Sequence, residues 1–310
     1  MTEKIHFDDV DDLIDICMDN VFKAVFTRDT PPSQFALSKL VSALIGREVS
    51  IIAISANEPP VDSLRDRQIR FDINCKAENG ELVNVEMSLN PDPFEPVRLE
   101  FYEGKLFTGQ DVRGIDKSYG DLQQAYQIAI LAKERFFPDE AFFHSFEYYD
   151  PIRRISLEGK TRIITLELSK LEKVVEKPTE KMDVKEYWAV YFKYLNDKKR
   201  RWKINEIMER EEGIAMASKV LMTISKDEQE RARLLSEYKY QMDTQSKLVH
   251  AKRMGIQEGM EKGMVKGMKK GMEKGMEKGM EKGMVKGRQE IINLLKNGKS
   301  PEEIIKGFSD

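Results

Sequence analysis

The chain has 310 residues, enough for one large domain or two smaller ones, and 40% of them are hydrophobic, as expected for a protein with a sizeable core. Its formal net charge is −3, so the total charge gives no sign of a nucleic-acid-binding protein. The two cysteines, Cys17 and Cys75, are too few for a disulfide framework and lack the paired spacing of a zinc site.

The charge is unevenly distributed along the chain. The segment from His250 to Gly287 contains ten Lys or Arg and five Glu, a net of +5, so the rest of the chain carries −8. No apolar stretch approaches the roughly 20 residues that span a bilayer, and the acidic N-terminus does not resemble a secretory signal. We therefore expect a cytoplasmic protein with reduced cysteines and no membrane segment.

Hydrophobic periodicity predicts alternating helices and strands. The second helix, over residues 33–45, follows Pro31-Pro32, has Ser33 as its cap and ends before Gly46. The other predicted elements are a helix over 10–26, strands at 49–55, 123–131, 141–148 and 161–168, a helix over 94–108, and mainly helical chain from about 183 onward.

Two alternating runs joined by Asn79-Gly80 predict a β-hairpin. Directly opposed residues of an antiparallel pair point to the same side, so paired residue numbers must sum to an even value if the apolar side chains are to share a face. A two-residue turn would pair Glu78 with Glu81, an odd sum, so we expect a loop of odd length or a bulge at Gly80. The apolar residues, all odd-numbered, are Phe71, Ile73, Cys75, Val83, Val85, Met87 and Leu89.

The opposite face of this hairpin carries the candidate chemistry. If paired numbers sum to 160, Asp72 opposes Ser88 and lies diagonal to Glu86, roughly 7–8 Å away at the backbone. Two carboxylates at this spacing can share Mg²⁺ or Mn²⁺, which prefer oxygen ligands. The alternative is that these polar residues form only the solvent-exposed face of the hairpin. The whole face comprises Arg70, Asp72, Asn74, Lys76, Asn84, Glu86, Ser88 and Asn90.

Residues 255–287 form a low-complexity repeat with glycine at every fourth position, most often Gly-Met-Glu-Lys. Each interior glycine costs a helix up to about 1 kcal/mol relative to alanine, so we expect a flexible or marginally helical basic linker. The alternative is an arm for oligomerisation or for tracking phosphates. Beyond it, Ser300-Pro301-Glu302-Glu303 is a capping box that predicts a helical hairpin resembling part of a helix-turn-helix, with self-association as an equally supported role.

Three short motifs, Asp19 to Phe26, Arg70 to Ile73 and Asn84 to Met87, occur in this order along the chain. In this order they resemble the PD-(D/E)XK nuclease family of transposases and recombination-promoting nucleases, and the resemblance extends over nearly the whole chain. Asp19 to Phe26 resembles the family's opening helix, Asp-x-x-Phe-Lys-x-x-Phe. Arg70-Phe71-Asp72-Ile73 resembles its first metal strand, and Asn84-Val85-Glu86-Met87 its second. Arg98 and Tyr102 match an Arg-x-x-x-Tyr pair on the next helix, and the glycine-rich tail is also similar.

The resemblance implies a restriction-endonuclease-like α/β core, with a mixed central sheet flanked by helices and a helical C-terminal extension. With the composition along the chain, we expect a nuclease-like domain over residues 1–180, a charged helical region over 181–250, the repeat over 251–287 and the helical hairpin over 288–310. The resemblance also implies a metal-dependent endonuclease that hydrolyses phosphodiester bonds of double-stranded DNA. A homo-oligomer formed through the C-terminal repeat and hairpin is a further expected assembly.

Site residues follow from the same resemblance. Asp72 and Glu86 would bind Mg²⁺ or Mn²⁺, and Asp19 would hold a water or a second ion. Arg98, with Arg70 and Lys76, would contact DNA phosphate. The alternatives are a helix-surface or capping carboxylate for Asp19 and a structural salt bridge for Arg98.

One departure from the family pattern affects this assignment. Two residues after the glutamate the family has Gln and the wider superfamily Lys, which would polarise the attacking water or contact phosphate, but this chain has Ser88. Either Lys76 or Arg70 substitutes for that side chain and Ser88 is tolerated, or the chain is a catalytically weak or inactive DNA-binding or assembly protein that retains the fold.

Overall fold

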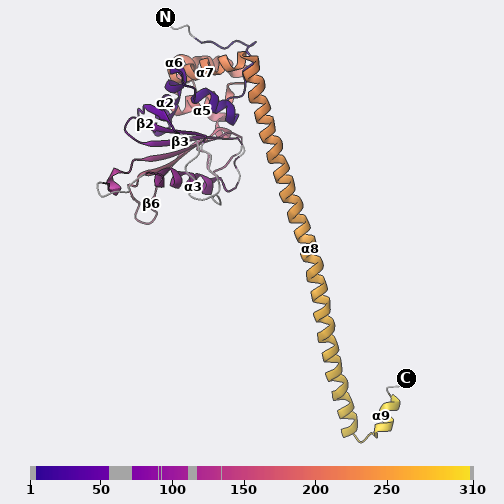
Figure 1. Cartoon of the computed structure of the whole chain (residues 1–310). Helices are drawn as coiled ribbons and strands as arrows, with labels where there is room; N and C mark the ends of the chain where they lie inside the picture. Colours follow the sequence, from indigo (N-terminus) through magenta and orange to yellow (C-terminus); the bar gives the residue numbers. More distant parts are fainter. Residues whose placement is uncertain are drawn as a thin grey trace. The chain divides into compact units, whose positions relative to one another are not determined.

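The computed structural model describes residues 5–55, 72–89, 91, 93–110, 117–133 and 135–307 (Figure 1). The chain divides into two compact units, Met1–Lys239 and Tyr240–Asp310. None of the helices in the described ranges is both long and apolar enough to cross a membrane.

A six-stranded mixed sheet forms the centre of the first unit, with strand order β1-β2-β3-β4-β8-β5 (Figure 1). The strands are β1 (Ile51–Ile54), β2 (Ile73–Ala77), β3 (Leu82–Ser88), β4 (Ala125–Leu131), β5 (Phe143–Phe146) and β8 (Thr161–Glu167), while β6 (Tyr149–Asp150) and β7 (Ile155–Ser156) form a separate ribbon. β3, β4 and β8 are parallel, and β1, β2 and β5 are antiparallel to their neighbours. The carboxyl ends of β3, β4 and β8 therefore lie along one edge of the sheet.

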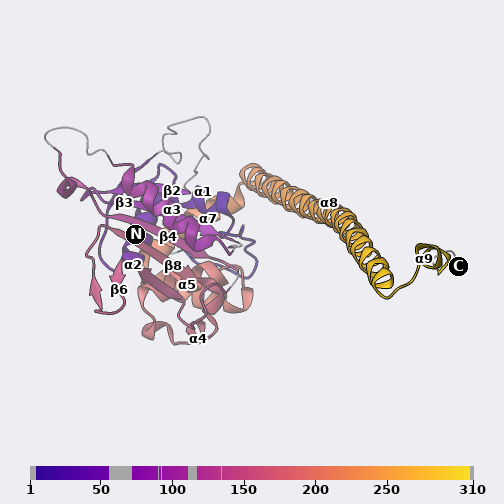
Figure 2. The ribbon, with the colours of Figure 1, turned by 90° about the horizontal axis from the view of Figure 1, so that it is seen from below.

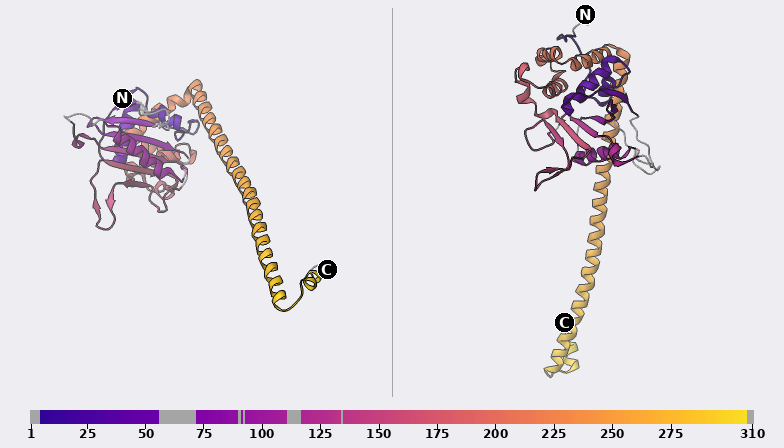
Figure 3. Two further views of the ribbon diagram at one scale, coloured as in Figure 1. Left: turned by 60° about the horizontal axis from the view of Figure 1, so that its bottom comes forward. Right: turned by 90° about the vertical axis from the view of Figure 1, so that its left-hand side faces the viewer.

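Helices cover both faces of this sheet. Figures 1 and 3 show α2, α5, α6 and α7 on one face, and Figure 2 shows α3 crossing the other. The helices are α1 (Asp19–Phe26), α2 (Pro31–Ile45), α3 (Glu95–Thr108), α4 (Glu172–Val175), α5 (Val184–Tyr194), α6 (Arg201–Arg210) and α7 (Glu212–Lys226), with 3₁₀ turns η1 (Tyr119–Asp121), η2 (Leu168–Lys170), η3 (Thr179–Lys181) and η4 (Lys198–Arg200).

The main hydrophobic core lies on the α2 side of the sheet. Phe22 and Phe26 of α1 pack against Trp188 and Phe192 of α5, and the three ring pairs that join the two helices have centroids 5.9–6.3 Å apart. Residues of α5, α6 and α7 thus contribute to the same core as the sheet. The division of the chain at residue 180 stays a prediction.

The N-terminal segment differs from the sequence prediction. α1 begins at Asp19, not near Val10, although Leu13 and Ile16 are buried as their spacing indicated. Distant side chains bond the backbone before Asp19 and replace helical hydrogen bonds: Arg231 donates to the Asp12 carbonyl (2.8 Å), and the Ile14 N–H donates to Ser225 (3.1 Å). Tertiary contacts therefore override local helical periodicity.

The predicted helix over 33–45 is confirmed as α2, and Gly46 ends it with a φ of 85°. Ser33 does not cap the helix, because α2 begins at Pro31. Its hydroxyl instead donates to the Val25 carbonyl (2.6 Å) and accepts from the Arg28 N–H (3.1 Å), and so ties α2 to the end of α1.

The β2–β3 hairpin has the predicted loop of odd length, comprising residues 78–80, since the Ala77 N–H donates to the Glu81 carbonyl (2.9 Å). Its paired residues include Ile73 with Val85 and Cys75 with Val83, so that paired numbers sum to 158 and not to 160. The prediction that paired residue numbers have an even sum is confirmed, but the predicted sum of 160 is wrong by two. Alternation fixes which residues share a face of the hairpin, whereas the geometry of the turn fixes which residues pair.

Most of α8 (Glu228–Lys296) and all of α9 (Pro301–Gly307) make up the second unit. The glycine repeat is helical, so of the two expected forms, flexible or marginally helical, the structure has the helical one. Most of the residues between the glycines are strong helix formers such as Met, Glu and Lys, and i,i+4 pairs such as Glu258–Lys262 (3.3 Å) add to them. The predicted capping box is present: Ser300 and Glu303 exchange hydrogen bonds of 3.0 and 3.3 Å.

We predict that Gly80→Ala destabilises the first unit by about 1–2 kcal/mol. Gly80 has a φ of 90°, and an added Cβ would lie 3.3 Å from the Gln123 side chain. Gly104→Ala is the matched control, because Gly104 lies within α3 with open space around it and should gain about 0.5–1 kcal/mol. Urea denaturation measures both variants, and a stable Gly80→Ala protein would contradict the observed turn.

Candidate active site

Asp72 and Glu86 lie next to each other at the carboxyl edge of β3. Extending the β2–β3 register by one residue places Asp72 directly opposite Glu86, closer than the predicted diagonal. Both side chains are therefore on the same side of the sheet, as the sequence analysis required. Ser88 lies two residues further along β3 on this face and is buried.

The polar face of β3 is covered, not exposed. α3 lies over this face (Figure 2), and Asn84 and Glu86 are at most 2% exposed. The alternative of a simple solvent face is therefore wrong for β3. The Asn84 amide donates hydrogen bonds to Glu86 Oε1 (3.1 Å) and to Gln127 Oε1 on β4 (2.8 Å). These bonds hold one carboxylate oxygen of Glu86 in place and leave the other toward α3.

Lys23 of α1 bridges two carboxylates, a role that the sequence analysis did not assign to it. Its Nζ atom lies 2.9 Å from Asp72 Oδ1 and 2.9 Å from Asp19 Oδ1. The Met87 N–H donates to Asp72 Oδ2 (3.2 Å), so both oxygens of Asp72 are bonded. The i,i+4 spacing of Asp19 and Lys23 was the available signal, because it places both on one face of a helix.

Arg98 of α3 reaches Glu86 from the other side. Its Nη2 atom lies 3.5 Å from Glu86 Oε2 and 2.5 Å from Glu95 Oε1, and its guanidinium lies over the Tyr102 ring at 5.7 Å. The salt bridge that the sequence analysis gave as an alternative for Arg98 is thus present. Contact between Arg98 and phosphate stays a prediction.

The remaining candidates are placed less favourably. Lys76 is exposed and lies four residues from Asp72 along the same chain, a separation of about 13 Å in an extended strand. Arg70 lies outside the described residues. Among the described residues, the cation that pairs with Asp72 is Lys23, which comes from the first helix.

Burial and neighbouring charge perturb both carboxyl groups. Burial, reinforced by Asp72, raises the pKa of Glu86 to about 8. Burial, reinforced by Asp19, raises the pKa of Asp72 to about 6. Burial alone would lower the pKa of Lys23, but Asp72 and Asp19 outweigh it and raise that pKa, so Lys23 stays charged. Ionisation of both carboxyl groups is therefore unfavourable in this site, and a bound cation would favour it.

The donor chemistry of this pair fits a divalent cation. Within the described ranges, no three His, Cys, Asp or Glu side chains form a group able to hold a metal ion. Asp72 and Glu86 nevertheless supply hard oxygen ligands from adjacent strands, which suit Mg²⁺ or Mn²⁺. A cation there would share Asp72 with Lys23.

A six-stranded mixed sheet flanked by helices is the architecture of a restriction-endonuclease-like core. The chain matches the sequence model described as PD-(D/E)XK nuclease family transposase over residues 16–251, and it belongs to this family. The predicted fold class is confirmed, with its mixed sheet and helical C-terminal extension. No match was found among curated proteins or among solved structures.

We predict that the metal-free protein loses stability as the pH rises from about 5 to 8. The folded state retains the Glu86 proton up to a pKa of about 8, whereas the unfolded state releases it near the ordinary value of 4.5. Glu86→Gln should remove much of this slope and add on the order of 2 kcal/mol at pH 8. Urea denaturation in EDTA at several pH values measures the free energy of unfolding, and Glu78→Gln, at an exposed position, is the control. An unchanged slope in Glu86→Gln would contradict the burial of an ionisable group.

Proposed function

We propose that the chain is a metal-dependent DNA endonuclease of the transposase or recombination-promoting type. The observation that supports this proposal is the position of Asp72 opposite Glu86, within the match to a nuclease family. PD-(D/E)XK nucleases generally use divalent metals and act on DNA, so the proposed cofactor is Mg²⁺ or Mn²⁺ and the proposed substrate is double-stranded DNA.

Each side chain of the site has a proposed role. Asp72 and Glu86 would hold the cation, with the Met87 backbone carbonyl as a third ligand. When bound, the cation would polarise the scissile phosphate and lower the pKa of a bound water. Arg98 would exchange its ion pair with Glu86 for a phosphate oxygen as substrate enters.

Lys23 is proposed to supply the positive charge that position 88 lacks. Ser88 is short and uncharged, but the Lys23 ammonium lies 2.9 Å from Asp72 and is oriented by Asp19. From this position it can donate a hydrogen bond to phosphate or to the attacking water, in place of Lys76 or Arg70. Asp19 then acts by orienting Lys23.

The alternative is a catalytically weak or inactive protein that binds DNA or assembles with other chains. One observation favours it: Lys23 and Arg98 already neutralise Asp72 and Glu86. A cation must therefore compete with these internal partners for both carboxylates. Oligomerisation through α8 and α9 and a cytoplasmic location are further parts of the proposal.

We predict that Asp72→Ala and Glu86→Ala each reduce Mg²⁺- or Mn²⁺-dependent nicking of supercoiled plasmid by at least about 100-fold, because each removes a ligand of the cation. Glu78→Ala is the control, since Glu78 lies exposed in the loop of the same hairpin and should cut like the wild type. Cutting that survives both site substitutions would remove the site assignment. Intact DNA binding without cutting under any metal would favour the alternative.

We also predict that Lys23→Met binds Mn²⁺ more tightly than the wild type while cutting DNA more slowly. Removal of the ammonium frees Asp72 and leaves Asp19 and Asp72 mutually repelling, which a divalent cation relieves. Isothermal titration measures the affinity, and plasmid nicking at saturating Mn²⁺ measures the rate. Lys76→Met, exposed on β2, serves as the control. Unchanged affinity and rate in Lys23→Met would exclude the role proposed for Lys23.

A further inference from the structure

A cavity of about 230 Å³ lies between α3 and the strands β8 and β5. It is on the same face of the sheet as Glu86, because Glu86, Ala129 and Thr165 are paired across β3, β4 and β8. Pockets that hold drug-sized ligands measure roughly 300–1,000 Å³, so this cavity suits a single ring system better than a complete nucleotide.

Three polar atoms at this cavity lack hydrogen-bond partners in the part of the chain that the structure describes. They are Glu103 Oε1, Thr165 Oγ1 and Arg162 Nε. Glu103 is only 4% exposed and Thr165 is completely buried. A buried polar atom without a partner costs about 1–3 kcal/mol, so a ligand with both a donor and an acceptor would find matching groups here.

Aromatic side chains form the apolar wall. Phe137, Phe146 and Tyr148 line the cavity, and the Phe137 and Phe146 ring centroids are 5.2 Å apart. Rings of this kind offer stacking surfaces to a flat ligand.

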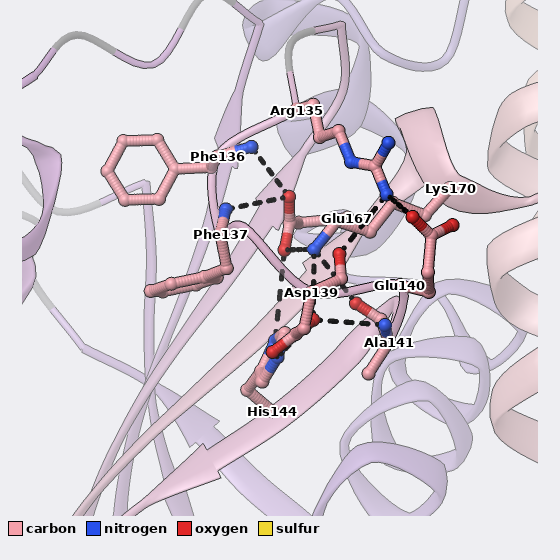
Figure 4. A network of polar contacts seen from close by, with 9 residues as sticks. All are labelled: Arg135, Phe136, Phe137, Asp139, Glu140, Ala141, His144, Glu167 and Lys170. Carbon is pink, nitrogen blue, oxygen red and sulfur yellow. Dashed lines mark hydrogen bonds and ion pairs between the residues drawn. The ribbon is translucent and has the colours of Figure 1, made fainter.

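A buried polar network fixes the position of Phe137 (Figure 4). Glu167, at the end of β8, accepts hydrogen bonds from the N–H groups of Phe136 (2.7 Å) and Phe137 (3.2 Å) and an ion pair from Lys170 (2.6 Å). Asp139 in the same loop binds His144 (3.0 Å) and Lys170 (3.3 Å). Phe137, one of the three aromatic residues of the wall, is therefore held in place before any ligand arrives, which lowers the cost of binding.

The charges at the cavity argue for a neutral ligand. Glu100, Glu103 and Glu147 disfavour a phosphate, and Arg162, which pairs with Glu147 at 2.8 Å, leaves its Nε–H for a neutral acceptor that an alkylammonium ion lacks. Burial, together with Glu100, raises the pKa of Glu103 to about 7. The cavity thus presents oxygen acceptors, one guanidinium donor and aromatic faces.

We propose that this cavity binds one nucleobase that carries an exocyclic amino group. The amino group donates to Glu103 and Thr165, a carbonyl or ring nitrogen accepts from Arg162, and the ring stacks on the aromatic wall. Thr165 is two strand spacings from Glu86, about 10 Å, so a base close to a phosphate at the candidate active site can reach the cavity. The base comes from DNA or from a free nucleoside, and only the DNA source rests on the proposed function.

Binding of free deoxynucleosides to the full chain tests the cavity directly. Saturation-transfer NMR with deoxycytidine and thymidine should give a dissociation constant on the order of millimolar for deoxycytidine, and binding about tenfold weaker for thymidine, which lacks the amino group. Thr165→Val should weaken deoxycytidine binding about three- to tenfold, and Glu103→Gln should also weaken it. Glu78→Gln, outside the cavity, should bind like the wild type.

Thermal melting distinguishes a binding role from a structural one. Thr165→Val replaces an unpartnered buried hydroxyl by a methyl group of similar shape, so the melting temperature should stay equal or rise. The proposal is overturned if deoxycytidine and thymidine bind equally, if Thr165→Val leaves deoxycytidine binding unchanged, or if no nucleoside binds at 10 mM, a ceiling about tenfold above the expected constant. Stronger binding of n-butylammonium than of deoxycytidine would also overturn it.

A competition experiment with oligonucleotides identifies whether the base comes from DNA or from a free nucleoside. If the base comes from DNA, single-stranded oligo-dC should displace deoxycytidine and oligo-dT should not, whereas displacement by neither would assign the cavity to free nucleosides. Asp72→Ala and Glu86→Ala should keep deoxycytidine binding. A protein that fails to cut DNA but binds deoxycytidine would therefore refute the proposed function and not this inference.

Discussion

The site depends on the burial of Glu86 beneath α3. A carboxylate that is only 2% exposed must be neutralised or protonated, and this requirement brings several separate elements together. Arg98 of α3 and Asn84 of β3 meet Glu86 itself, while Lys23 of α1 meets the neighbouring Asp72. The buried carboxyl groups are thus met by partners from α1, α3 and the hairpin, and an added cation would meet the same requirement.

The sequence predicts the hairpin better than its surroundings. Alternation showed which residues of β2 and β3 share a face and required a loop of odd length, which the three-residue loop ending at Gly80 supplies. Alternation did not distinguish a register in which paired residue numbers sum to 158 from one in which they sum to 160, because both registers keep the same residues on the same face. Nor did it reveal that α3 covers the polar face, since an alternating strand has the same pattern whether that face contacts solvent or a helix. The ion pairs of Lys23 and Arg98 depend on contacts distant in sequence.

Helix prediction failed where tertiary hydrogen bonds or composition outweighed local rules. The residues before Asp19 have helical apolar spacing, but side chains of Arg231 and Ser225 bond their backbone. The glycine repeat shows the opposite case: the cost of its glycines predicted a flexible or only marginally helical segment, yet the whole tract lies within α8. The positions of apolar residues and glycines alone therefore did not predict the conformation of either segment. Before Asp19 it depends on hydrogen bonds from distant side chains, and in the repeat on the residues between the glycines.

Because glycine recurs at every fourth residue from 255 to 287, this part of α8 consists of helical repeats of equal length. Four residues advance an α-helix by about 6 Å and turn it by about 40° beyond a full revolution. Loss or gain of one Gly-Met-Glu-Lys repeat would therefore shorten or lengthen α8 by about 6 Å. The sequence on either side of the repeat would stay the same. The same change would rotate the position of α9 around the α8 axis by about 40°. The number of repeats therefore determines both the length of α8 and the direction in which α9 leaves it.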